Sequence, residues 1–351
     1  MRIMNASAAL LGVSALLALP AAFAAERVQV VTSFSILADM IENVGGEHVD
    51  VTSLVGADSD AHVYSPRPTD ARALANADLV VFNGLQFEGW MDRLIDASDY
   101  AGPLVITTDG IERVAMSHDD HGQDEHDDHD EHGHDDHGHD DHGDDDHDDH
   151  DDHDHGDDDP HGWQDLAVGK VYVTNIRDGL IEADPENAEA YSANAERYIN
   201  EIDAADADIR ALLTEIPAST SVITGHDSFG YFASAYGLRF LSPVGLSTEA
   251  EPSAANMAQL IDVIRSENVQ ALFHENMTSP AIINQLAEET GLPIAGTLFA
   301  DALAAEGDAG TWLGMMRHNA QTLHDALAQP GHDDHAHDND DDDDHGHSHS
   351  H

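Results

Sequence analysis

Histidine and aspartate dominate two stretches of this chain, and both of these side chains bind divalent metals. The first stretch, His118 to His161, holds 14 of the 27 histidines and 23 of the 70 acidic residues. The second, His332 to His351, adds seven histidines. Neutral imidazole is the usual ligand for cations such as Zn²⁺, and carboxylates add charge that attracts them. We therefore expect a protein that handles a transition metal, rather than one with acidic runs that serve only solubility.

The same stretches contain too few apolar side chains to offset the entropy lost on ordering. We expect a disordered His/Asp-rich loop at 118–160 and a disordered His/Asp-rich tail at 331–351. The tail mixes histidine with Asp, Gly and Ser, which argues against an engineered tag. The formal charge is −57, and the rest of the chain, outside the two stretches, still contains 39 acidic and only 13 basic residues. This charge disfavours nucleic acid or anionic lipid as a partner.

Residues 1–24 have the pattern of a cleavable signal peptide. Arg2 supplies the positive start, Ala8 to Leu19 forms a short apolar core, and Ala22-Phe23-Ala24 provides a small-x-small cleavage site. The chain has no cysteine, which excludes disulfides, thiolate metal sites and a lipid-modified cysteine. We therefore expect a periplasmic protein whose metal site uses His, Asp or Glu.

Two blocks of alternating strand and helix patterns predict an α/β fold with two parallel sheets. In the first block the expected strands are 28–33, 49–55, 79–83 and 104–107, with helices at 36–44, 69–77 and 91–97. In the second block the expected strands are 221–224, 239–241, 271–274 and 294–298, with helices at 229–236, 253–267, 280–290 and 311–328.

A long helix at 184–217 separates the blocks. Asp184-Pro185 has the residue types of a helix start, and apolar residues then recur four and three positions apart from Tyr191 to Ile216. A coiled-coil segment would show the same spacing, but the pattern stops at Pro217. We expect an N-terminal lobe at 25–117, completed by 161–183, and a C-terminal lobe at 218–330.

Four potential ligands lie where strands end, the usual place for a site in open α/β sheets. His62 follows the second strand in a loop stiffened by Pro66 and Pro68, and His226 ends the strand at 221–224. His161 stands where Pro160 and Trp163 mark a return to order, and Asp301 follows the last strand. All four are expected to face a cleft between the lobes.

The segments around these residues resemble the zinc- and manganese-specific solute-binding proteins of ABC importers, the cluster A-I family with its ZnuA-like and AztC-like members. The matching segments are Asp60–Pro66, Asp159–Trp163, Gly225–Tyr231 and Met315–Asn319. The resemblance covers nearly all of the mature chain. It implies two (β/α)4-type lobes joined by one long rigid helix, with the metal in the inter-lobe cleft. A His-rich acidic loop before the second ligand is typical of the zinc members.

The resemblance also implies the ligands His62, His161, His226 and Asp301. Three imidazoles and one carboxylate suit tetrahedral zinc. Manganese-type members tend to have a carboxylate where His226 stands, in line with the preference of Mn²⁺ for oxygen. Two features depart from the family: Ala61 stands where some zinc members have an acidic neighbour, and the C-terminal tract is an addition.

Several alternatives remain open at this stage. Water, or Asp308, could replace Asp301 as the fourth ligand, and His274-Glu275 could support a ligand by a hydrogen bond. We expect His48, His318 and His324 to be surface or helix-cap residues. The remaining candidates are the tryptophans Trp90, Trp163 and Trp312, expected in the core or at the rim of the site, and the supporting or surface carboxylates Asp39, Asp227 and Glu249.

The expected function is binding rather than catalysis: a monomer holds zinc tightly and delivers it to an inner-membrane ABC permease, with a periplasmic zinc chaperone as a further candidate partner. Imidazole must be neutral to bind, so affinity should fall at low pH. The alternatives are a zinc storage protein, an importer protein for manganese, nickel or iron, and a zinc hydrolase. A hydrolase needs an open coordination position and a general base, and the chain has no HExxH motif.

Overall fold

The computed structural model describes residues 27–114, 158–218, 220–248, 252–267 and 269–328. The expected signal peptide, the tail and nearly all of the His/Asp-rich loop lie outside these residues. None of the helices in the described part of the chain combines the length and the apolar character that a membrane span requires.

The N-terminal lobe is built on a four-stranded parallel sheet with strand order β2-β1-β3-β4. Its strands are β1 (Val28–Phe34), β2 (Val49–Val55), β3 (Leu79–Phe82) and β4 (Leu104–Ile106), and its helices are α1 (Ser35–Gly45), α2 (Pro68–Ala75) and α3 (Met91–Ser98). All four residues of β3 are buried, as expected for a central strand covered on both faces.

The C-terminal lobe repeats this arrangement with the order β6-β5-β7-β8. Its strands are β5 (Ser221–Ile223), β6 (Arg239–Leu241), β7 (Val269–Glu275) and β8 (Ile294–Leu298). Its helices are α6 (Gly230–Tyr236), α7 (Ala254–Ser266), α8 (Ala281–Thr290) and α9 (Trp312–Leu327). In each sheet the strand order reverses beside the first strand, which is where open parallel sheets place their ligands.

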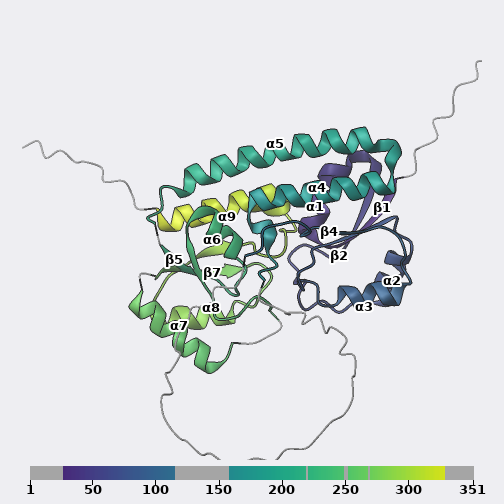
Figure 1. Cartoon of the computed structure of the whole chain (residues 1–351). Coiled ribbons are helices and arrows are strands. Elements are labelled where there is room, and N and C mark those ends of the chain that lie inside the picture. The colour runs from purple at the N-terminus through teal and green to yellow at the C-terminus, as the bar shows by residue number, and fades with distance from the viewer. Residues whose placement is uncertain (1–26, 115–157, 219, 249–251, 268, 329–351) are drawn as a thin grey trace, which may run out of the picture.

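One long helix connects the lobes, and a second helix leads into it from the N-terminal lobe. Helix α4 (Leu166–Ala183) leads through a short 3₁₀ turn at Pro185–Asn187 into α5 (Ala188–Leu213), which runs along both lobes (Figure 1). The α-helix therefore begins three residues after Pro185, because the proline opens a 3₁₀ turn and not the helix itself. The buried face of α5 includes Tyr191, Tyr198 and Ile202, as the spacing predicted.

The sequence pattern does not predict helix α4. It contains Gly169 and Gly179 together with several β-branched residues, which weaken a helical signal. Both glycines are needed for packing. A Cβ atom at Gly169 would lie 2.1 Å from the Trp312 ring, and one at Gly179 would lie 2.2 Å from Val105.

One cluster of buried apolar residues extends through both lobes and the connecting helices. It includes Val30 and Leu79 of the N-terminal lobe, Ile202 of α5, and Phe273 and Leu323 of the C-terminal lobe. A second, smaller cluster lies between the C-terminal sheet and helices α7 and α8. The two-lobed α/β fold joined by a long helix confirms the predicted fold class.

Candidate metal centre

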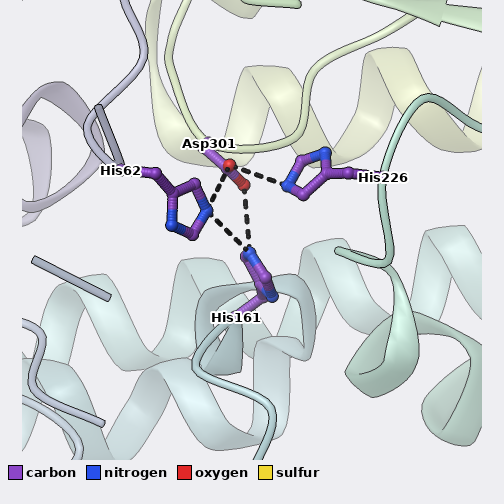
Figure 2. A group of neighbouring side chains, drawn as sticks. All are labelled: His62, His161, His226 and Asp301. Atoms are coloured by element: carbon purple, nitrogen blue, oxygen red, sulfur yellow. Dashed lines mark hydrogen bonds and ion pairs between the residues drawn. The ribbon is translucent and has the colours of Figure 1, made fainter. Parts of the chain in front are cut away.

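The structure brings together the four residues singled out in the sequence. Nitrogen and carboxylate atoms of His62, His161, His226 and Asp301 all lie within 4.8 Å of one another, and their side chains converge from four separate segments (Figure 2). Asp301 Oδ2 is 3.2 Å from His62 Nε2 and 3.0 Å from His226 Nε2, and Asp301 Oδ1 is 3.6 Å from His161 Nε2. The residues are 0 to 4% exposed, with His62 the most exposed.

Tryptophan side chains position the segments next to two of these residues. Trp90 Nε1 donates a hydrogen bond of 2.7 Å to the carbonyl of Ala61, beside His62. Trp163 Nε1 donates one of 2.8 Å to the carbonyl of Ala300, beside Asp301. The tryptophans are buried, as expected, and they also determine where the neighbouring side chains lie.

A buried polar network holds the segment that carries His161. The Asn83 side chain donates from Nδ2 to the Pro160 carbonyl at 2.8 Å, and its Oδ1 accepts a hydrogen bond of 2.7 Å from the Tyr172 hydroxyl. Asn83 is held in turn by the Glu88 carboxylate, which accepts hydrogen bonds from the Asn83 N–H at 2.8 Å and the Ser33 hydroxyl at 2.6 Å. Burial raises the pKa of Glu88 to about 7.

Two of the imidazoles are each paired with a carboxylate on the side away from the cluster. His161 Nδ1 is 2.7 Å from Asp159 Oδ1, and His226 Nδ1 is 2.7 Å from Glu275 Oε2. An ionised carboxylate only accepts hydrogen bonds, so Nδ1 carries the proton in both rings. In the neutral rings this leaves the lone pair of each Nε2 directed into the cluster, as a metal ligand requires.

These carboxylates were only partly visible in the sequence. Asp159 stands in the Asp-Pro-His segment, which predicts no role for its carboxylate, and the sequence predicts a supporting hydrogen bond only for the pair His274-Glu275. The structure separates that pair: Glu275 bonds to His226, whereas His274 Nε2 faces Asn284 Oδ1 at 3.0 Å. The Asp-x-His spacing was the available signal for Asp159, whose Oδ1 also accepts from the His161 N–H at 2.9 Å.

The charges of the cluster support one another. Burial alone would lower the pKa of His226, but the carboxylates of Glu275 and Asp301 outweigh it and hold that pKa well above its usual value. Burial alone would raise the pKa of Asp301, but His226 and His161 hold it well below the usual range. The cluster therefore contains an ionised carboxylate at neutral pH.

Several buried atoms of the cluster lack a partner that a cation would supply. His226 Nε2 and both carboxylate oxygens of Asp301 have no properly aligned hydrogen bond, despite the short distance between these residues. Leaving buried polar atoms unsatisfied is costly. The three imidazole nitrogens and the carboxylate of the cluster form a donor set that fits a divalent cation.

The other candidates lie outside this cluster. His48 packs against the Tyr191 ring, His318 Nε2 is 3.3 Å from the Thr297 carbonyl, and His324 pairs with Glu215 at 2.9 Å. Asp39 accepts a hydrogen bond from the Trp312 N–H. Among the described residues, neither Asp308 nor Asp227 belongs to the four-residue group, and Glu249 lies outside the described part.

Two parallel-sheet α/β lobes, a long connecting helix and a buried four-residue cluster between the lobes are the architecture of a solute-binding protein with a candidate metal site. The family described as zinc-uptake complex component A, periplasmic (ZnuA), matches residues 30–326. The chain therefore belongs to this family, whose members are binding components of ABC transporters and not enzymes.

Similar proteins carry names that refer to several metals. The chain is 30% identical to the manganese-binding lipoprotein MntA of Halalkalibacterium halodurans, over 87% of this chain and 90% of that protein. It is 26% identical to the iron-binding protein YfeA of Yersinia pestis, over 87% and 88%. The solved structure of the periplasmic zinc-binding protein TroA from Treponema pallidum aligns with a TM-score of 0.73 at 26% identity, covering 86% of this chain and 100% of that one.

Proposed function

We propose that this protein binds Zn²⁺ through His62, His161, His226 and Asp301, and delivers it in the periplasm to an inner-membrane ABC permease. The observation that carries the proposal is the donor set, three imidazole nitrogens and one carboxylate within 4.8 Å in a buried position. Zinc accepts four ligands of this kind in a closed tetrahedron. Because the protein supplies all four, this arrangement leaves no open position for hydrolytic chemistry.

Manganese is the competing cargo, because several relatives are named for it. Mn²⁺ favours more oxygen ligands than the single carboxylate of this cluster provides. His226 supplies nitrogen, and its bond to Glu275 keeps Nε2 available for a metal. The donor chemistry therefore favours zinc.

A calorimetric titration with Zn²⁺ and, separately, with Mn²⁺ tests the proposal on the mature chain and on a His62→Ala/His226→Ala variant. We expect one tight zinc step above a shallow multi-ion background, and loss of that step in the variant. If the protein binds Mn²⁺ more tightly than Zn²⁺, the transported cargo is manganese and not zinc. A variant that binds zinc as the parent does would place the metal on the His/Asp-rich stretches and support a storage function.

In this proposal the His/Asp-rich loop and tail hold further zinc ions weakly and raise the zinc concentration near the cleft. The loop and the tail hold 20 of the 27 histidines, which supports a supply role. The same stretches are the candidate docking arms for a periplasmic zinc chaperone. The protein acts as a monomer, because one chain provides the whole ligand set.

A further inference from the structure

The loop that carries His62, residues 56–67 between β2 and α2, is bonded to the opposite lobe. Asp60 Oδ1 accepts a hydrogen bond of 2.9 Å from the His62 N–H, and Asp60 Oδ2 accepts one of 2.7 Å from the Thr248 hydroxyl. Thr248 follows β6 in the C-terminal lobe. One carboxylate therefore connects the backbone of a cluster residue to the other lobe.

The peptide unit between Ala61 and His62 is held at both of its polar atoms. Its carbonyl accepts from Trp90 within the N-terminal lobe, and its N–H donates to Asp60. These two hydrogen bonds to the backbone matter because, among the described residues, no carboxylate pairs with His62 Nδ1. In contrast, His161 Nδ1 and His226 Nδ1 each pair with a carboxylate. The position of His62 therefore depends more on its backbone than does that of either other imidazole.

Asp60 and Thr248 also line a cavity of about 440 Å³ that extends to His226. The hydroxyl-bearing residues Thr278 and Ser279 line the same cavity. Because His226 belongs both to the cavity wall and to the buried cluster, the Asp60–Thr248 hydrogen bond spans the two lobes beside the cluster.

The start of the loop is anchored separately. The Asp58 carboxylate accepts hydrogen bonds of 3.0 Å from Asn276 Nδ2 and from the Ala305 N–H, and the Asp58 N–H donates to the Leu303 carbonyl at 2.9 Å. These bonds and the apolar core shared by the lobes resist separation of the lobes. Loss of the single Asp60–Thr248 bond would therefore free the His62 segment locally.

We propose that Asp60 is a positioning residue for His62, and that its hydrogen bond to Thr248 is an inter-lobe latch that slows release of the bound metal. This inference rests on the proposed function, because it takes the cluster as the metal site. The latch acts on the ligand that is most exposed and that, among the described residues, has no carboxylate paired with its Nδ1 atom. Metal leaves when the latch opens and His62 moves away, while His161, His226 and Asp301 keep their places.

The test measures zinc dissociation by stopped flow, with Zn²⁺ as the ligand and an excess of chelator. The relevant signal is the slow phase that His226→Ala removes. Thr248→Val should accelerate this phase about tenfold, as expected for the loss of one hydrogen bond to a charged group. Thr248→Ser keeps the hydroxyl, and its dissociation rate should stay within about twofold of that of the parent. The association rates of both Thr248 variants should also stay within about twofold of the parent.

Thr278→Val is the matched control, since it makes the same substitution in the same cavity wall, and among the described residues Thr278 makes no bond across the lobes. The absorption spectrum of bound Co²⁺ should be unchanged in the Thr248 variants, because the ligand set is retained. Adding Thr248→Val to Asp60→Ala should cause no further acceleration, since the two residues act as one pair.

The latch is overturned if Thr248→Val releases zinc as slowly as the parent, or if Thr278→Val accelerates release equally. It is also overturned if the Co²⁺ spectrum changes in a Thr248 variant, or if the effects of Thr248→Val and Asp60→Ala are additive. If only the latch fails, His226→Ala still removes the slow phase. If His226→Ala leaves zinc binding unchanged, the proposed function itself fails.

Discussion

Each lobe contributes one imidazole that is held by a carboxylate of the same lobe. Asp159 holds His161 in the N-terminal lobe, and Glu275 holds His226 in the C-terminal lobe, both at 2.7 Å. The orientation of these rings is therefore set by the protein itself, without a bound metal. Such preorganisation reduces the ordering that metal binding would otherwise require.

Glu275→Gln and Asp159→Asn should each weaken zinc binding about 10- to 100-fold, because an amide leaves each imidazole a weaker and less fixed donor. Competition with a chelator of known affinity measures the loss. Asp227→Asn is the control, since this carboxylate lies nearby but is not among the carboxylates bonded to the cluster imidazoles. An equal loss in Asp227→Asn would show that net charge matters and not the two hydrogen bonds.

Glu88 should make the stability of the metal-free protein depend on pH. Its pKa is raised from 4.5 to about 7, so its contribution to stability is full below pH 4.5 and declines as the pH rises to about 7. The shift corresponds to about 3 kcal/mol. Denaturant titration across this pH range measures the free energy of unfolding of the parent and of Glu88→Gln. The parent's value relative to that of the variant should fall by about 3 kcal/mol as the pH rises. A constant difference would mean that Glu88 titrates normally.

At the scale of elements, helix α4 owes its place to close packing that its helix propensity does not reveal. Gly169 lets α4 approach the ring of Trp312, and Trp312 Nε1 in turn donates to the Trp163 carbonyl at 3.0 Å. Because Trp163 positions Ala300 beside Asp301, the contact between α4 and α9 supports the four-residue cluster.

Gly169→Ala should destabilise the protein by about 1 to 2 kcal/mol, since overpacking against Trp312 outweighs the gain in helix propensity. Chemical unfolding of the metal-free protein measures this change. Gly89→Ala serves as the control, because no atom lies within 4 Å of its added methyl group. A stabilised Gly169→Ala variant would show that the Trp312 ring moves aside at little cost.

At the scale of the whole molecule, the described residues on either side of the long insertion, residues 115–157, lie at one place. The Asp159 N–H donates to the Val114 carbonyl at 2.9 Å, and Arg113 pairs with Asp158 at 2.7 Å. The Tyr231 hydroxyl, on α6 of the other lobe, accepts from the Val114 N–H at 3.3 Å. Both ends of the insertion are thus fixed beside the segment that carries His161.

Replacing residues 115–157 by a short Gly-Ser linker should leave one tight zinc site, with its affinity changed by no more than about threefold, because the paired ends already fix His161. The number of weakly bound ions should fall. Calorimetric titration of the shortened chain measures both quantities, and circular dichroism checks its folding. Loss of the tight step in a folded variant would show that the insertion supplies a ligand.

The sequence alone determined the order of the strands and of the helices other than α4, because short β-branched runs and helical spacing are local properties of the chain. It also predicted that His62, His161, His226 and Asp301 would meet, since parallel sheets bring the ends of their strands to one edge, and a family resemblance named the same residues. Their place in one cluster is observed, and their role as ligands stays a prediction.

Only the tertiary structure decided which groups surround these four residues. Helix α4 depends on the contact between Gly169 and Trp312, Glu275 meets His226 from 49 positions away, and Thr248 reaches Asp60 across 188 positions. Such partners leave no periodic pattern, because a hydrogen bond between distant segments exists only once packing has brought them within 3 Å. Local patterns set the elements, and the folded core set the partners of each site residue.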